Sequence, residues 1–216
     1  MESKYELTNK QKKYLPVKRA IDVILSSGAI VILSPILGAI SLAIKLDSEG
    51  PVLFKQQRVG KDKALFEIWK FRSMYTNTPN DLPTHMLDNP DIYITKIGKF
   101  LRKTSLDELP QIFNIFKGQM SIIGPRPALW NQYDLIAERD KYGANSVTPG
   151  LTGWAQINGR DELEIPVKAR FDGEYVKKMC FGMDVKCFFG TIITVLSFDG
   201  VVDGVVNEVH KKEGNK

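Results

Sequence analysis

Two adjacent carboxylates are the strongest candidates for chemistry in this sequence. Asp107 and Glu108 lie in the segment TSLDELPQ, between Ser105 and Pro110. A helix capped by Ser105 would form an ordinary capping box with Glu108, but Pro110 would then be its fifth residue, where proline is costly. A helix capped by Asp107 tolerates Pro110 in its first turn. Either helix places Asp107 in the positive field of a helix N-terminus, which stabilises a carboxylate and attracts phosphate oxygens.

Basic residues near this acidic pair indicate what it could act on. Arg126 stands between Pro125 and Pro127, whose fixed φ angles reduce the entropy lost when a guanidinium is presented to a ligand. A guanidinium suits a diphosphate because it can donate two parallel hydrogen bonds. Any one of these basic residues, taken alone, is more often a solvated surface charge. The other candidates for binding phosphate or substrate are Arg102, Arg160, Lys70 and Arg72.

The segment from Val23 to Ile44 predicts how the chain meets a membrane. Its 22 residues carry no charge and are long enough to cross a hydrocarbon core of about 30 Å. A buried helix of a soluble protein is the alternative. Both flanks are basic, and basic flanks prefer the cytoplasm, so a straight span would export one of them. Ser34 and Pro35 lie mid-segment, where proline kinks a helix. We favour a re-entrant helix, broken at Ser34-Pro35, over a kinked helix that spans.

Asp22 lies at the edge of the apolar segment, after Lys18 and Arg19. It is interpreted either as a local ion pair at the membrane interface or as an anchor for the helix. An acidic pair with basic neighbours, in a chain that also carries a membrane element, indicates chemistry on a phosphate at a bilayer.

The composition is that of a folded protein with a modest positive charge. Of 216 residues, 43% are hydrophobic and 25% are charged, which excludes a disordered chain. The net charge of +5 favours phosphates, nucleic acid or lipid headgroups as partners, without selecting among them. Cys180 and Cys187 make no disulfide framework, and neither histidine stands near a cysteine as a zinc site requires. A reduced, cytosol-facing compartment is the simplest interpretation.

The rest of the chain predicts a mixture of strands and helices, including amphipathic helices that lie in a core or in the membrane interface. Sequence patterns predict two strands over 50–74, a loop over 76–91, helices over 107–118, 130–142 and 163–178, a loop or short strand over 148–162, and a packed or interfacial apolar segment over 184–198.

Several motifs make the chain similar to a known family. In order, they are KRAID, an apolar SP, KFRSM, LRKTSLDELPQIFNIFKGQMSIIGPRP and TPGLTGWAQINGR. With these motifs, the chain resembles the monotopic polyprenyl-phosphate phosphoglycosyl transferases, the bacterial sugar transferases that start surface glycan assembly. The resemblance runs from about Val17 to Ser197, and its middle block is long and specific. Long members of the family carry an N-terminal membrane domain with four spans. This sequence shows no such domain, so we expect it to be the short form.

The resemblance implies an α+β, helix-rich, membrane-associated fold. Its expected organisation is a basic segment over 1–17, a re-entrant membrane helix over 18–46, a cytoplasmic catalytic domain over 47–200, and a polar tail over 201–216.

The resemblance also implies a site and a reaction on the cytoplasmic face of the bacterial inner membrane. A sugar-1-phosphate would pass from a UDP-sugar to polyprenyl phosphate, expected to be undecaprenyl phosphate, with release of UMP. Asp107 would attack the β-phosphate and form an aspartyl-phosphosugar intermediate. Mg²⁺ would lie at Asp107 and Glu108, and Glu108 would hold the metal or assist proton transfer. Arg126, Arg102 and Arg160 would contact phosphate or substrate. Membrane lipids are further expected partners, and a homodimer is left open.

Two other functions compete with this interpretation. One is a catalytically inactive membrane adaptor of glycan assembly, which the intact Asp107-Glu108 pair argues against. The other is a basic nucleic-acid binder, but the sequence shows no nucleic-acid-binding motif and this function leaves the apolar segment unexplained, so no nucleic-acid partner is expected. After Arg160 the chain departs from the family pattern, with Ile165-Pro166 and Cys180 in the region expected to contact the sugar. The sequence therefore does not identify the sugar.

Overall fold

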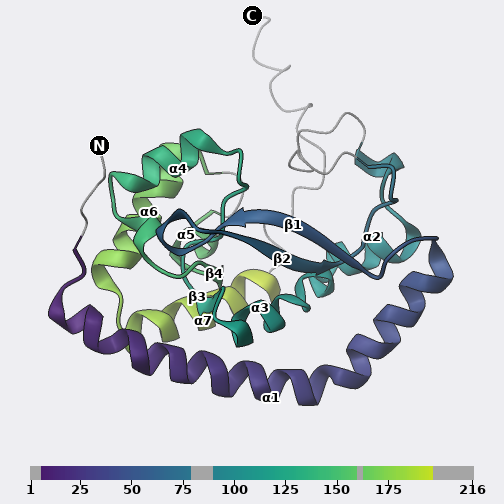
Figure 1. The fold of residues 1–216 in the computed structure, drawn as a ribbon, viewed down its shortest axis with the longest axis horizontal. Helices are drawn as coiled ribbons and strands as arrows, with labels where there is room; N and C mark the ends of the chain where they lie inside the picture. The colour runs from purple at the N-terminus through teal and green to yellow at the C-terminus, as the bar shows by residue number, and fades with distance from the viewer. Residues whose placement is uncertain (1–5, 79–89, 160–162, 197–216) are drawn as a thin grey trace, which may run out of the picture.

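The computed structural model describes residues 6–78, 90–159 and 163–196, and Figure 1 shows a long helix that curves around a mixed helical and stranded body. The predicted helix-rich α+β class is confirmed. The helices are α1 (Asn9–Asp47), α2 (Lys96–Lys103), α3 (Gln111–Lys117), α4 (Tyr133–Asp140), α5 (Trp154–Ile157), α6 (Ile165–Lys178) and α7 (Phe181–Leu196). The strands are β1 (Leu53–Val59), β2 (Leu65–Phe71), β3 (Ser121–Ile123) and β4 (Gly150–Thr152). Short 3₁₀ turns cover Lys61–Lys63, Pro90–Ile92, Leu106–Glu108 and Ala144–Ser146.

Helix α1 begins earlier than the sequence predicts. Its 39 residues start after Thr8, whose hydroxyl accepts from the Gln11 N–H while the Gln11 side chain accepts from the Thr8 N–H. This capping box extends the helix through much of the basic segment, and the division into a segment over 1–17 and a membrane helix over 18–46 stays a prediction. The helix is continuous through Ser34 and Pro35. The predicted break there stays a prediction. Within the described residues, α1 is the one helix long and apolar enough to cross a membrane.

The first half of α1 is tied to the body by polar contacts. The Lys18 ammonium lies 2.5 Å from a carboxylate oxygen of Asp184 in α7. The Tyr14 hydroxyl donates to the same oxygen, and the Tyr175 hydroxyl donates to the other, each at 2.8 Å. Asp22 accepts from the N–H of Ile122 in β3 at 2.9 Å, so it anchors the helix to a strand 100 residues away. These buried charges have partners, as burial of a charge requires.

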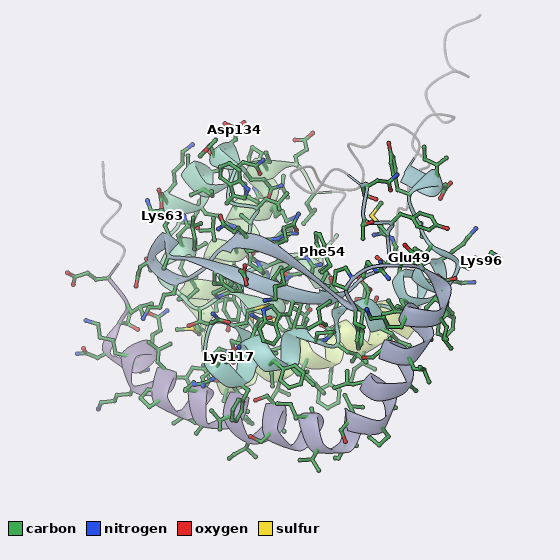
Figure 2. The ribbon with its side chains drawn as sticks, turned by 45° about the vertical axis from the view of Figure 1, so that its right-hand side comes forward. Glu49, Phe54, Lys63, Lys96, Lys117 and Asp134 are labelled. Atoms are coloured by element: carbon green, nitrogen blue, oxygen red, sulfur yellow. The ribbon has the colours of Figure 1, made fainter. Side chains whose placement is uncertain are left out.

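Strands β1 and β2 form the predicted antiparallel hairpin. Leu53 pairs with Phe71 and Val59 with Leu65, and a turn with positive φ at Asp62 and Lys63 joins them. Figure 2 shows Lys63 at this turn and Glu49 near the opposite end of the hairpin, where α1 ends. Side chains alternate between the faces of a strand, so every second residue of the hairpin points toward the body.

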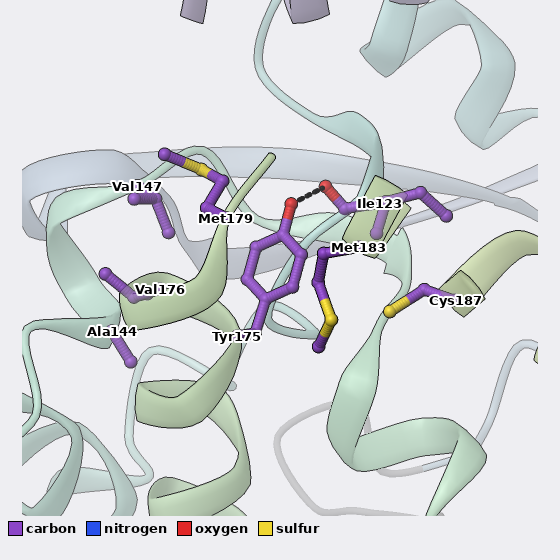
Figure 3. Close-up of a cluster of buried hydrophobic side chains, with 8 residues drawn as sticks. All are labelled: Ile123, Ala144, Val147, Tyr175, Val176, Met179, Met183 and Cys187. Carbon is purple, nitrogen blue, oxygen red and sulfur yellow. Dashed lines mark hydrogen bonds between the residues drawn. The ribbon is translucent and has the colours of Figure 1, made fainter. Parts of the chain in front are cut away.

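The second sheet is small and parallel. β3 pairs with β4, with Ser121 opposite Gly150 and Ile123 opposite Thr152. Helices α6 and α7 supply much of the core behind it, including Tyr175, whose ring is buried and whose hydroxyl also donates to the Ile123 carbonyl at 3.3 Å (Figure 3). The α6 prediction at 163–178 is confirmed, and the apolar segment predicted from 184 is the helix α7, beginning at Phe181. Most of the loop predicted over 76–91 lies outside the described residues.

A buried ion pair between α4 and α6 should dominate the stability of that half of the body. Arg139 and Asp172 are 4% and 1% exposed, and their side chains approach to 2.6 Å. Arg139→Met would leave the carboxylate buried without a partner, and we expect it to lower the free energy of unfolding by about 3–5 kcal/mol. Thermal unfolding in detergent measures the change.

Lys178→Met on the same helix is the matched control. Its pair with Glu174 is 3.7 Å long and exposed, with side chains 64% and 36% accessible. Exposed pairs at this spacing contribute about 0–0.5 kcal/mol. Equal destabilisation by the two variants would contradict the importance given to the buried pair.

Candidate active site

The acidic pair lies in a short turn between α2 and α3, and neither predicted helix cap is formed. Ser105 has a positive φ of 56°, in the left-handed region, whereas an N-cap residue is usually extended, and it makes no capping hydrogen bond. Helix α3 begins only at Gln111, with Pro110 just before it, where its missing N–H costs nothing. Asp107 and Glu108 occupy a 3₁₀ turn instead. The helix-terminus field invoked from the sequence is therefore not what determines the properties of this pair.

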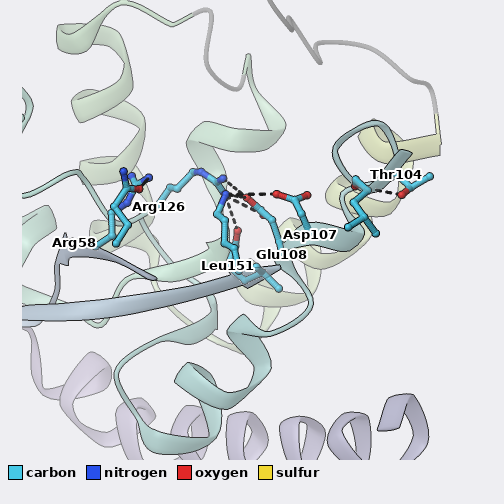
Figure 4. A network of polar contacts seen from close by, with 9 residues as sticks. Arg58, Thr104, Asp107, Glu108, Arg126 and Leu151 are labelled. Atoms are coloured by element: carbon cyan, nitrogen blue, oxygen red, sulfur yellow. Dashed lines mark hydrogen bonds and ion pairs between the residues drawn. The ribbon is translucent and has the colours of Figure 1, made fainter. Parts of the chain in front are cut away.

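Two cations hold Glu108. Lys70 donates to its Oε1 at 2.8 Å. Arg126 approaches with both terminal nitrogens, at 2.5 Å to Oε1 and 3.3 Å to Oε2 (Figure 4). The Lys70 ammonium also lies 3.9 Å from Asp107 Oδ2. One ammonium therefore stands between the two carboxylates, and the structure brings together four of the residues that the sequence singled out.

Three separate elements deliver these groups. Lys70 is near the end of β2, opposite Phe54 in the hairpin register. Arg126 follows β3, in a loop whose position depends on the parallel pairing of β3 with β4. The acidic pair stands before α3, where Asn114 accepts from the Trp69 N–H at 3.0 Å and donates to the Glu67 carbonyl at 2.7 Å, so that α3 is fastened to β2.

The two carboxyl groups are perturbed in opposite directions. Burial raises the pKa of Asp107 above its ordinary value, the charge of Lys70 opposes the rise, and the charge of Glu108 adds to it. Burial also acts against the charged form of Glu108, but Arg126 and Lys70 outweigh it and hold the pKa of Glu108 well below its usual range. Glu108 is thus a fixed negative charge, whereas Asp107 is a desolvated carboxyl group with a raised pKa, the pattern typical of functional sites.

The remaining predicted residues lie in different places. Arg102, at the end of α2, is close enough for its charge to lower the pKa of Asp107. Arg72 is buried, and its guanidinium donates to the carbonyls of Glu49 and, at 2.7 Å, Ser48, just beyond the C-terminus of α1. It holds the end of α1 and is not brought to the acidic pair. Arg160 lies outside the described residues.

Sequence reasoning missed two residues that shape the site. Asn114 fastens α3 to the hairpin, and Arg58 donates to the carbonyl of Pro127, beside Arg126. Neither carries a local signal. Asn114 reads as a polar residue inside a helix, and Arg58 as one of several basic residues after the membrane segment.

The site partly fits a magnesium ion. Mg²⁺ prefers carboxylate and phosphate oxygens and commonly takes one or two protein carboxylates together with substrate phosphates and water. The Asp107 carboxylate meets this requirement, while both oxygens of Glu108 already contact cationic side chains. The described residues contain no group of three or more His, Cys, Asp or Glu side chains able to hold a metal. A metal here would therefore depend on the substrate for its other ligands.

Opposite substitution effects on stability should follow from the opposite pKa shifts. Because the folded state raises the pKa of Asp107, its ionised form is destabilising, and Asp107→Asn is expected to raise the melting temperature at neutral pH. The gain should shrink as pH falls toward the unfolded-state value of about 3.9. Glu108→Gln should instead destabilise by about 1–3 kcal/mol, because it removes charged hydrogen bonds to Lys70 and Arg126. Thermal unfolding from pH 4 to 8 tests both variants. Destabilisation by Asp107→Asn at neutral pH would contradict a raised pKa of Asp107 in the folded state.

Comparisons with known proteins agree on the kind of protein this is. The family described as bacterial sugar transferase matches residues 13–198. The chain is 44% identical over 184 residues to the UDP-glucose:undecaprenyl-phosphate glucose-1-phosphate transferase of Escherichia coli (strain K12), covering 82% of this chain and 39% of that protein. It is 40% identical to the UDP-N-acetylgalactosamine-undecaprenyl-phosphate N-acetylgalactosaminephosphotransferase of Aeromonas hydrophila, covering 85% of this chain and 44% of that protein.

A third relative is similar in length. The exopolysaccharide production protein PSS of Rhizobium leguminosarum bv. phaseoli is 39% identical over 194 residues, covering 85% of this chain and 96% of that protein. The chain thus spans less than half the length of the Escherichia coli and Aeromonas relatives and nearly all of the Rhizobium one. The matched residues include the acidic turn, the loop that carries Arg126 and most of α1. This chain belongs to the bacterial sugar transferase family.

Proposed function

We propose that the chain transfers a sugar-1-phosphate from a UDP-sugar to undecaprenyl phosphate, releases UMP, and so starts assembly of a surface polysaccharide or glycoconjugate. The observation that carries the proposal is the buried Asp107 beside a glutamate whose charge is balanced by Lys70 and Arg126. The names of two relatives describe this type of transfer, with glucose and with N-acetylgalactosamine. The name of the third describes exopolysaccharide production.

The proposed reaction has two displacements at one phosphorus atom. A carboxylate oxygen of Asp107 attacks the β-phosphorus of the UDP-sugar. The bond from this phosphorus to the oxygen that bridges the two phosphates breaks, and UMP leaves with that electron pair. The phosphosugar remains on Asp107 as an acyl phosphate. A phosphate oxygen of the lipid then attacks the same phosphorus, the bond to Asp107 breaks, and the carboxylate is regenerated.

The neighbouring charges suit both displacements. Lys70 and Arg126 already approach the carboxylates, and their charges would stabilise the negative charge on the transferring phosphoryl group. Glu108 would keep both cations in place and would also stand beside a bound metal. Asp107, with Glu108 next to it, would hold Mg²⁺, which when bound screens the diphosphate. Arg102 would add to the positive potential, and Arg160 is proposed to contact substrate.

We also propose that α1 enters and leaves the membrane on one face. Support comes from its contacts, because both halves of the helix pack on the same body. The first half is tied to β3 and α7 through Asp22 and Lys18. The second half packs through Ile44, and Asp47 accepts from the N–H of Ile97 in α2 at 3.1 Å. A straight span would carry one end away from these contacts.

The middle of α1 offers an apolar surface for the bilayer. Its most exposed apolar side chains there are Val31 and Ile32, at 73% and 75%. Further exposed apolar residues on α7 include Phe189 and Ile193. Figure 1 shows α7 lying along the side of the body that α1 follows. We propose that this side rests on the cytoplasmic face of the bacterial inner membrane, with the catalytic body in the cytoplasm, where UDP-sugars and the lipid phosphate meet.

Release of UMP is the test of the proposed reaction. Purified protein in detergent, with Mg²⁺ and undecaprenyl phosphate, should release UMP from one member of a panel of UDP-sugars that includes glucose, galactose and N-acetylgalactosamine. Asp107→Asn should lower turnover by more than about 10³-fold, because loss of a nucleophile removes the covalent route. UMP and UDP are quantified separately, so the responding sugar is identified in the same assay.

A control variant separates chemistry from folding. Lys178→Met changes an exposed residue of α6 and should keep full turnover. Release of UDP in place of UMP would mean ordinary glycosyl transfer and would overturn the aspartyl mechanism. Absence of release across a broad panel would favour the adaptor role.

Labelling of single cysteines tests the topology. With Cys180→Ser removing the exposed native thiol, Lys10→Cys and Glu49→Cys place one probe near each end of α1. A membrane-impermeant maleimide should label both from the cytoplasmic side in inverted vesicles and neither from the opposite side in intact cells. Labelling of the two positions from opposite sides would show a span.

A further inference from the structure

We infer that Arg58 is a positioning residue that sets the direction of Arg126, an inference that rests on the proposed function. Arg58 lies in β1, and its guanidinium joins two groups. Nη1 donates to the carbonyl of Pro127 at 3.1 Å, and Nη2 donates to Oε1 of Gln56 at 2.7 Å. Figure 4 draws Arg58 in the same network as Arg126 and the acidic pair. The carbonyl it binds belongs to the residue directly after Arg126.

The loop around Arg126 needs such donors from outside. Pro125 and Pro127 lack N–H groups, so the loop has few donors of its own, and its carbonyls depend on neighbouring strands. The Gly150 N–H donates to the Pro125 carbonyl and the Val59 N–H donates to the Ala128 carbonyl, both at 2.9 Å. Between these backbone bonds, the Pro127 carbonyl receives its hydrogen bond from a side chain. This contact of the loop can therefore be removed by one substitution that leaves the strands intact.

The hairpin register connects Arg58 to the acidic pair a second way. Arg58 pairs with Phe66 and Phe54 pairs with Lys70, and positions 54 and 58 of one strand face the same side. Arg58 and Lys70 therefore project from one face of the hairpin, about 13 Å apart along it. At one end of this face, Lys70 contacts Glu108 directly. At the other end, Arg58 binds the loop that carries Arg126, the second cation at Glu108. A single hairpin therefore positions both positive charges that contact Glu108.

The geometry of the guanidinium group explains why an arginine suits position 58. A guanidinium is planar and presents donors in fixed directions, so it can bind Gln56 on one side and a loop carbonyl on the other. A lysine would keep the positive charge but would not present two donor nitrogens in fixed directions. If Arg58 acted through its charge on the substrate, Arg58→Lys would restore activity. If it acts through geometry, Arg58→Lys and Arg58→Met should fail alike.

A double-mutant cycle on turnover tests the inference. Arg58→Met should lower kcat/KM for the UDP-sugar about 10- to 100-fold, the size expected when a remote change misplaces a catalytic group. It should alter kcat and KM in the same proportion as Arg126→Met. The double variant should be no worse than Arg126→Met alone, because a residue that acts through another has nothing left to position. Lys55→Met, on the same strand but the opposite face, removes an equal charge and should stay within about twofold of the wild type.

Hydrogen exchange gives a readout that does not depend on activity. In Arg58→Met the amides of Ala128 and Leu129 should exchange faster, while those of Lys55→Met should match the wild type. Losses that multiply in the double variant, rescue by Arg58→Lys, or unchanged exchange at Ala128 and Leu129 would each overturn the inference. A wild-type protein that releases no UMP would refute the proposed function, and the exchange result would still decide whether Arg58 holds the loop.

Discussion

The site depends on one electrostatic arrangement. Lys70 and Arg126 balance the negative charge of Glu108, so that Asp107 can stay buried beside it. Two adjacent carboxylates repel each other, and burial adds a desolvation cost to each. Lys70 and Arg126 distribute this cost unequally, because both contact Glu108 closely, at 2.8 and 2.5 Å, whereas Lys70 lies 3.9 Å from Asp107. One carboxyl group becomes a permanent anchor for cations. The other, Asp107, keeps a raised pKa and a longer ion pair, 3.9 Å from Lys70, which suits a nucleophile.

The anchoring of α1 reaches the same site through β3. Asp22 holds the N–H of Ile122, and Tyr175, itself bound to the partner of Lys18, holds the carbonyl of Ile123. Arg126 follows three residues after Ile123. The helix proposed to lie in the membrane and the arginine proposed to meet the diphosphate are thus joined by a short, hydrogen-bonded strand. Rotation of α1 about its axis would break contacts on both sides of that strand.

Local patterns predicted the β1–β2 hairpin, α6, the apolar part of α1 and the acidic pair, because each is encoded by residues close in sequence. Predictions failed where a distant or unusual contact decides. The caps at Ser105 and Asp107 are wrong since Ser105 adopts a positive φ. Arg72 was expected at phosphate, but it binds carbonyls beyond the end of α1, 23 residues away in sequence. The pairing of Lys70 with Glu108 and of Arg58 with Pro127 depends on how the hairpin packs, which spacing alone does not reveal.

The KFR sequence at the end of β2 shows how the fold can fix the depth of the site. Lys70 and Arg72 are two residues apart in extended backbone, so their side chains leave the same face about 6–7 Å from each other. Lys70 reaches Glu108, and Arg72 reaches the carbonyls that follow α1. The acidic pair therefore lies a short, fixed distance from the point where α1 returns to the body. If α1 enters the bilayer as proposed, this spacing holds the carboxylates near headgroup depth, where a lipid phosphate can reach Asp107.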